Sequence, residues 1–135
     1  YVEYLLFIAR FFQQEGDNRL ISILMESGDE NPIQRWKEDL LIAQSLVCEG
    51  KTQEVVDLLH EVIERNSNLR GGSAVADYLP KTLGMLGLAY FNLGDKNKAI
   101  EFMFKAKYEC ELNGDKNGVN VYNHNLQFLQ KQNLD

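Results

Sequence analysis

Apolar residues recur at intervals of three and four along most of the chain, which is the spacing of helices that bury one face. Pro32 and Pro80 are the only prolines, and short clusters of glycine, asparagine and aspartate separate the apolar stretches. This pattern predicts an all-α fold. The expected helices span residues 2–14, 18–27, 33–48, 52–65, 75–92, 96–112 and 119–132.

Three of the predicted turns look alike, because each follows an apolar helix and opens a more polar one. Their sequences are ARFFQQEGDNRLI, AQSLVCEGKTQEVV and LAYFNLGDKNKAI. The glycines of these turns, Gly16, Gly50 and Gly94, are 34 and 44 residues apart, and Leu86 recurs as Leu126 after 40 residues. Recurrence at such intervals is typical of repeat proteins, in which stacked helical pairs bury a shared core.

The third of these units carries an ordered set of small and large positions. The set is Leu86-Gly87, Tyr90, Gly94-Asp95, Ala99, Met103 and Ala106. In this order and spacing the residues resemble the motif of the tetratricopeptide repeat (TPR) family, with Leu83 in the place of its Trp and Glu111 in the place of its closing Pro. The other units match the motif at fewer positions, and together the matches cover nearly the whole chain.

The resemblance implies a right-handed α-solenoid of about three TPR helix-turn-helix pairs and a C-terminal capping helix, all within one domain of residues 1–135. The expected bounds are 2–31, 36–69 and 80–113 for the repeats and 119–132 for the capping helix. The long spacers resemble those of the forty-residue TPR variant found in kinesin light chains. Because the chain begins with Tyr1 rather than methionine, we expect it to be a fragment of a larger protein.

Several small residues have expected roles in this packing. Gly87 is expected where two helices cross, because a larger side chain would force them apart. Tyr90, one turn later, is expected to be largely buried between paired helices. Gly94 is expected to end a helix in the left-handed conformation, which strains glycine least. The stretch NLRGGS, residues 68–73, is expected to form an irregular corner.

The TPR resemblance also implies a function, which is protein or peptide binding by a scaffold whose first helices line a concave groove. The family's groove positions, carried over to this chain, are Arg10, Lys37, Gln44, Lys81, Leu88, Phe91, Asn92, Asn125, Phe128 and Lys131. The basic members suit an acidic or carboxylate-ended peptide, and an asparagine amide suits a peptide backbone because it both donates and accepts hydrogen bonds. The competing interpretations are that the lysines are simply exposed and that the asparagines mark a weak terminal helix.

A second functional hypothesis is self-association, or regulation of another domain of the same protein. The helix at 119–132 has Leu126, Phe128 and Leu129 as apolar anchors. It therefore either caps the stack or offers an exposed apolar face through which a homodimer forms.

Composition argues against several other classes of protein. The net charge of −6 argues against nucleic-acid binding, which needs lysine and arginine to neutralise phosphates. The apolar opening YVEYLLFIARFF is too short to span a bilayer, so we expect no membrane partner. Cys48 and Cys110 stand alone, without a CxxC motif, and favour reduced thiols in a cytoplasmic protein.

No known catalytic motif occurs in the chain. His60 and His124 are the only histidines and fall in different predicted helices, and each cysteine is interpreted as a packing residue. We therefore expect no enzyme activity, no metal site and no cofactor.

Overall fold

The computed structural model describes residues 31–69 and 72–131. This part of the chain contains five helices and no strand: α3 (Pro32–Cys48), α4 (Thr52–Arg65), α5 (Ser73–Asn92), α6 (Lys96–Leu112) and α7 (Lys116–Lys131). The all-α prediction is confirmed, and each of these helices begins and ends within three residues of its expected bounds. The expected helices at 2–14 and 18–27 and the groove residue Arg10 lie outside the described residues.

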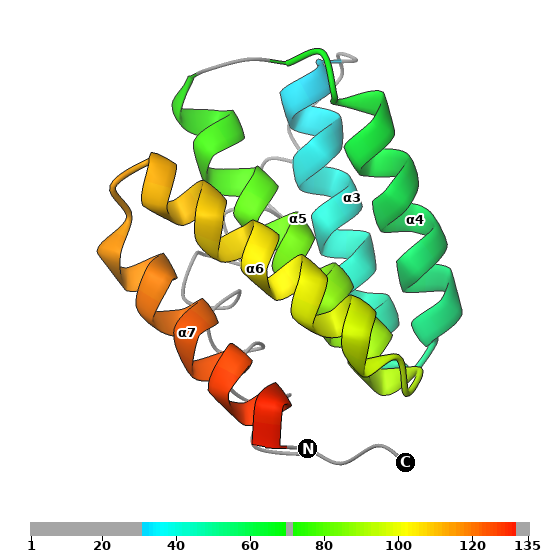
Figure 1. Ribbon diagram of the computed structural model, residues 1–135. Coiled ribbons are helices and arrows are strands. Elements are labelled where there is room, and N and C mark those ends of the chain that lie inside the picture. Colours follow the sequence, from blue (N-terminus) through cyan, green and yellow to red (C-terminus); the bar gives the residue numbers. More distant parts are fainter. Residues whose placement is uncertain (1–30, 70–71, 132–135) are drawn as a thin grey trace. The chain divides into compact units, whose positions relative to one another are not determined.

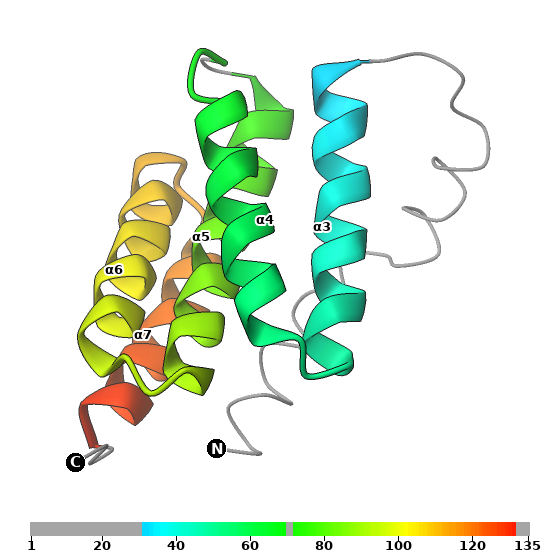
Figure 2. The same cartoon turned by 90° about the vertical axis from the view of Figure 1, so that its right-hand side faces the viewer.

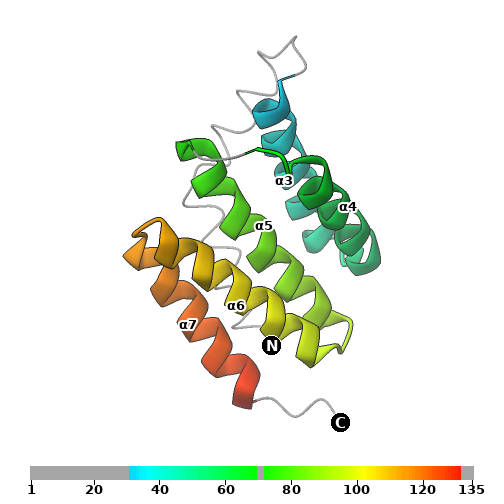
Figure 3. The same cartoon turned by 45° about the horizontal axis from the view of Figure 1, so that its top comes forward.

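The chain divides into two compact units, Tyr1–Arg70 and Gly71–Asp135. In the first unit, α3 and α4 pack on each other as a hairpin that is closed by a short turn (Figure 2). In the second unit, α6 packs against both α5 and α7, and the three helices lie side by side (Figures 1 and 3).

Side-chain caps fix where two of the helices begin. The Asn31 side chain accepts a hydrogen bond from the Ile33 amide at 2.9 Å, and Pro32 follows at the first helical position, where its missing N–H costs nothing. Asp95 caps α6 in the same way, because its carboxylate accepts from the Lys98 amide at 3.1 Å. These caps place the starts of α3 and α6 close to the residues that the sequence pattern predicts.

The turn between α5 and α6 matches its prediction. Gly94 has a φ of 85°, which is the left-handed conformation expected at the end of a helix. The Asp95 amide donates to the Tyr90 carbonyl at 2.9 Å and the Gly94 amide to the Phe91 carbonyl at 3.0 Å. The last carbonyls of α5 are therefore satisfied, and the chain reverses within three residues.

The crossing of α5 and α6 also matches its prediction. A Cβ added at Gly87 would lie 3.0 Å from the Met103 side chain and 3.2 Å from the Ala99 carbonyl oxygen. A side chain at this position would thus push the two helices apart. Tyr90 is partly rather than fully buried, because its ring lies at the edge of the crossing, where it stacks on Phe102 with the ring centroids 5.5 Å apart.

Pro80 lies inside α5, where it cannot donate a backbone hydrogen bond. The carbonyl that such a bond would satisfy belongs to Ala76, and it accepts instead from the Asn113 side-chain amide at 3.2 Å. The Pro80 carbonyl accepts a hydrogen bond from the Tyr122 hydroxyl at 3.1 Å. Side chains from the end of α6 and from α7 therefore support α5 at its proline.

The corner before α5 is not helical in the described residues 66–69 and 72, as the sequence predicts. Gly72 has a φ of 79°, and α5 begins directly after it. Inserting two glycines after Asn68 is expected to change the free energy of unfolding by less than about 0.6 kcal/mol, because loop-closure entropy grows slowly with loop length. Urea denaturation followed by circular dichroism measures this.

The matched control for the corner is the same insertion after Leu86, in the middle of α5, which should abolish folding of the second unit. If the two insertions destabilise the protein equally, the corner is not the tolerant connection that its backbone suggests.

Candidate functional site

Two of the predicted groove residues in the second unit are in contact, and Asn92 and Asn125 are their neighbours on the same helices. Phe91 of α5 meets Phe128 of α7 edge to face, with the ring centroids 6.0 Å apart and the ring planes at 70°. Earlier along both helices, the Tyr122 ring of α7 lies against Gly84 of α5, so α5 and α7 run in the same direction. We call Phe91, Asn92, Asn125 and Phe128 the α5/α7 face.

Burial varies across this face. Phe91 is 5% exposed and Asn125 is fully buried, and the predicted groove residue Leu88, one turn before Phe91, is 1% exposed. Asn92 and Phe128 are partly exposed, and on the same helix as Phe128 the side chains of His124 and Lys131 are exposed. The accessible part of the predicted groove therefore lies at the C-terminal end of α5 and along α7.

Two amide oxygens on the α5/α7 face have no donor. Among the described residues, Asn92 Oδ1 and Asn125 Oδ1 are both shielded from solvent and accept no hydrogen bond. The Asn125 amide nitrogen lies 4.0 Å from Met103 Sδ, which is a weak acceptor. A buried polar atom without a partner is uncommon in folded proteins and is unfavourable until a donor reaches it.

Lys81, a predicted groove cation, is not at an open surface. Its side chain is 6% exposed, and its ammonium lies 3.0 Å from Asp77 Oδ1 one turn earlier in α5. All residues from Pro80 to Ala89 are buried, so this stretch of α5 has no solvent-facing side on which a lysine could sit freely. The positive charge of Lys81 is therefore engaged within its own helix.

The remaining predicted groove residues belong to the first unit. Lys37 and Gln44 lie seven residues apart on α3, on one side of the helix, and both are partly exposed. This unit also contains an ion pair between Asp39 of α3 and Arg65 of α4, which joins its two helices.

The apolar anchors of α7 are mostly engaged. Leu126 is 4% exposed and Leu129 is fully buried, while Phe128 is partly exposed. The Tyr122 ring is fully buried against Gly84. α7 thus covers the neighbouring helices with its apolar side.

A second surface, which helical periodicity alone does not reveal, lies on α6. Phe104, Tyr108 and Leu112 are 47%, 60% and 63% exposed, and we call these three residues the α6 strip. Beside it is an open hollow of about 590 Å³, lined by Leu79 and Leu83 of α5 and by residues of α6 between Phe104 and Glu111. The sequence shows an apolar residue at every fourth position here, in addition to the residues that pack inward, but it does not show which of the two sets is exposed.

The two cysteines offer no activated nucleophile among the described residues. Burial, followed by the nearby charges of Asp115 and Glu109, raises the pKa of the Cys110 thiol to about 12. Cys110 therefore stays protonated and packs as a small apolar group. Cys48 is an exposed free thiol at the end of α3.

Residues 31–69 and 72–131 contain neither a cluster of metal ligands nor a helix suited to cross a membrane. No three side chains of His, Cys, Asp and Glu in these ranges gather where they could hold a metal ion. None of the helices in the same ranges combines the length and the apolar character needed to cross a bilayer.

Comparisons with known proteins complete the description of the site. The chain matches no protein-family model, and neither a curated protein nor a solved structure is similar to it.

Proposed function

We propose that the chain is a protein- or peptide-binding scaffold of TPR-like helical pairs, stacked as a right-handed solenoid, and that the α5/α7 face holds an extended segment of the partner. Support for the stacking comes from the close crossing at Gly87 and from the shared direction of α5 and α7. The observation that carries the binding function is that Asn92 and Asn125, on the two helices joined by the Phe91–Phe128 contact, each have an unsatisfied amide oxygen.

An extended peptide offers what these oxygens lack. Its backbone N–H groups donate hydrogen bonds and its carbonyls accept them, so an asparagine amide holds the backbone without reading the side chains. Asn92 is partly exposed as a residue but its Oδ1 is shielded, and Asn125 is covered altogether, so a side-chain movement must uncover each oxygen before a peptide N–H can reach it. The partly exposed ring of Phe128, in contact with Phe91, supplies apolar surface one turn along α7 from Asn125.

More residues of the α5/α7 face suit a peptide backbone than suit an acidic side chain or a terminal carboxylate. Lys81 is paired with Asp77, and of the basic groove positions in the second unit only Lys131 is exposed. A terminal carboxylate would therefore rest on Lys131 at the end of α7.

Selection of a phage-displayed library of random linear peptides on the immobilised protein, followed by calorimetric titration of the recovered peptides, tests the proposal. Asn92→Leu and Asn125→Leu are each expected to weaken binding about tenfold, since a lost hydrogen bond to a desolvated group costs roughly 1.4 kcal/mol. Asn120→Leu is the matched control, because Asn120 lies on the exposed side of α7. Recovery of no binding peptide, or equal losses in all three variants, would overturn the proposal.

Asn125→Leu should also stabilise the unbound protein. Leucine has nearly the shape of asparagine but no oxygen that needs a donor, so the free energy of unfolding is expected to rise by about 1 kcal/mol. Urea denaturation of the variant and the wild type measures the difference. A large loss of stability would mean that the Asn125 amide is structural, and the combination of higher stability with weaker peptide binding separates the two roles.

A further inference from the structure

The α6 strip gathers most of the exposed large apolar side chains of the described residues on one helix. Of the five large hydrophobic side chains that are exposed among the described residues, three are Phe104, Tyr108 and Leu112. They follow one another at every fourth position, so they form a continuous ridge along one side of α6. Exposed apolar ridges of this kind mark surfaces that another molecule covers.

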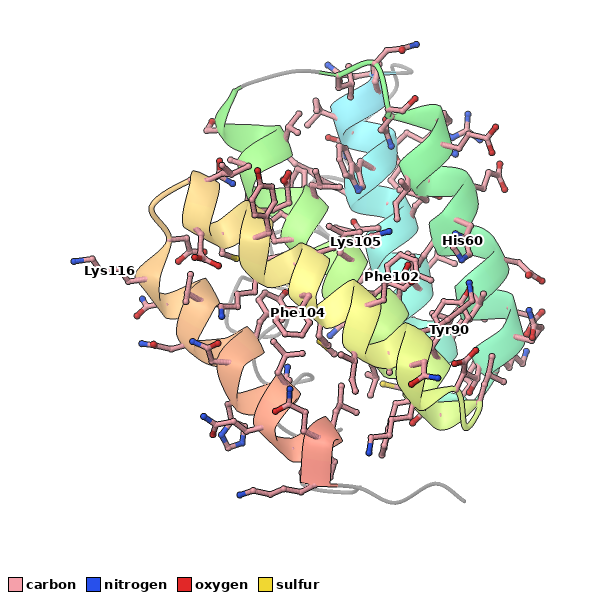
Figure 4. All side chains as sticks on the ribbon, viewed as in Figure 1. His60, Tyr90, Phe102, Phe104, Lys105 and Lys116 are labelled. Atoms are coloured by element: carbon pink, nitrogen blue, oxygen red, sulfur yellow. The ribbon has the colours of Figure 1, made fainter. Side chains whose placement is uncertain are left out.

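The charges beside the strip follow a regular order. Lys105 and Glu109 lie one turn apart on one flank of the strip, and Lys107 and Glu111 lie one turn apart on the other. Between Lys105 and Glu111, each flank therefore runs from positive to negative along the helix, and Glu101 precedes Lys105 by one turn. Figure 4 shows Phe104 and Lys105 leaving α6 on different sides. The midpoint of this charge pattern is Tyr108, at the centre of the strip.

We infer that the α6 strip is the interface of a homodimer, in which α6 packs antiparallel against α6 of a second copy with a two-fold axis beside Tyr108. In an antiparallel pair related by a two-fold axis, each flank of α6 lies against the same flank of the second α6, whose sequence runs in the opposite direction. Lys105 then faces Glu109 of the second copy, and Lys107 faces Glu111 of the second copy. Because a two-fold axis repeats every contact, four ion pairs form around one apolar centre.

The apolar residues fit the same arrangement. Tyr108 meets Tyr108 of the second copy at the axis, and Phe104 lies beside Leu112 of the second copy. The hollow next to the strip, with Leu79 and Leu83 in its wall, gives the incoming aromatic side chains room to pack. Parallel pairing in register would instead bring opposite flanks together, placing Lys105 near Lys107 and Glu109 near Glu111 of the second copy, and like charges in contact destabilise.

The charge pattern also argues for a second copy over an unrelated partner. A uniformly acidic or basic ligand would meet one attractive and one repulsive half on each flank. In the isolated chain, Lys105 pairs with Glu101 at 3.2 Å, and both side chains are about half exposed. That pair is solvated and weak, and the ammonium also lies 4.8 Å from the centre of the Phe102 ring, so a carboxylate of the second copy would add to these contacts.

Sedimentation equilibrium of the full chain tests the inference. One helix from each copy makes a small interface, so we expect a dimer with a dissociation constant of roughly micromolar size. Lys105→Glu places like charges opposite Glu109 of the second copy and is expected to weaken the dimer at least about tenfold. The double variant Lys105→Glu/Glu109→Lys restores opposite charges across the axis and is expected to dimerise as the wild type does.

Cross-linking provides a geometric test in a Cys48→Ser background, which removes the exposed thiol. Tyr108→Cys is expected to form a disulfide-linked dimer on mild oxidation, because the two copies of this residue meet at the axis. Asn97→Cys, an exposed position near the start of α6, is the matched control and should stay monomeric, since its two copies lie at opposite ends of the interface.

A wild type that sediments as a monomer up to its solubility limit would overturn the inference, as would a double charge variant no stronger than Lys105→Glu. Neither result touches the proposed peptide binding, which rests on different residues.

Discussion

Replacement of Tyr122 by alanine is expected to lower the free energy of unfolding by about 3–5 kcal/mol, the range found for large aromatic side chains removed from a core. The Tyr122 ring is fully buried, and its hydroxyl donates to the Pro80 carbonyl at 3.1 Å. The variant therefore loses the packing between α7 and α5 together with the hydrogen bond. Urea denaturation followed by circular dichroism measures the loss, and Tyr122→Phe, which removes the hydroxyl alone, should cost about 1 kcal/mol.

Substitution of Gly84 tests whether the Tyr122 ring packs directly against this position of α5. A Cβ at Gly84 would lie 2.5 Å from Tyr122 Cε1 and 2.7 Å from the hydroxyl oxygen, so Gly84→Ala should destabilise the wild type by about 1–3 kcal/mol. In a Tyr122→Ala background the clash is gone, and the same substitution should stabilise the protein by up to about 1 kcal/mol, because alanine favours helix more than glycine does. An effect of the same sign in both backgrounds would show that the ring does not rest on Gly84.

Replacement of Asp39 by alanine is expected to lower the free energy of unfolding by about 2–3 kcal/mol, because it leaves a largely covered guanidinium without its close partner. The Asp39 side chain is 12% exposed and that of Arg65 is 25% exposed. The second carboxylate near Arg65 belongs to Glu61, at 3.8 Å and 66% exposed, and it is too solvated to compensate. Chemical denaturation of the variant measures the cost.

Two further variants separate the charge from the packing at this pair. Glu61→Ala should cost less than about 0.5 kcal/mol, as exposed pairs do. The double variant Asp39→Leu/Arg65→Met removes both charges and should recover most of the stability, since apolar groups of similar volume replace a buried ion pair without a desolvation penalty. Equal losses from Asp39→Ala and Glu61→Ala would mean that the Asp39–Arg65 pair does not join α3 to α4.

Periodicity and turn chemistry predict the local structure well because both depend only on residues that are close together in the sequence. Asp95 and Gly94 mark the turn before α6 through a cap and a left-handed backbone, and each needs only a few adjacent positions to act. Gly87 was predictable for a related reason, since a small residue within an apolar helix indicates a close crossing.

The candidate site depends on distances between side chains of different helices, and the pattern of residues along one helix does not give these distances. Lys81 falls on the predicted groove side of α5, yet α5 is buried all round at that level, and the lysine pairs with Asp77. The unsatisfied oxygen of Asn125 depends on which donors of α5 and α6 fail to reach it. The exposure of Tyr108 likewise depends on where α6 has no neighbour, so the position of a residue on a helix wheel could not reveal it.

The support that α5 receives at Pro80 has a consequence for chemical ageing. Asn113, whose amide nitrogen donates to Ala76, is followed directly by Gly114, and an Asn-Gly sequence is prone to deamidate through a cyclic imide. In the folded chain the hydrogen bond to Ala76 restrains that side chain, and attack by the Gly114 nitrogen requires the side chain to move. Once the end of α6 opens, the amide can be converted to a carboxylate, which cannot donate to Ala76 and is unfavourable at the C-terminal end of a helix. The fraction of deamidated protein in an aged sample would thus increase with how often that end of α6 opens. Each deamidated chain would also open there more readily, because it has lost the hydrogen bond to Ala76.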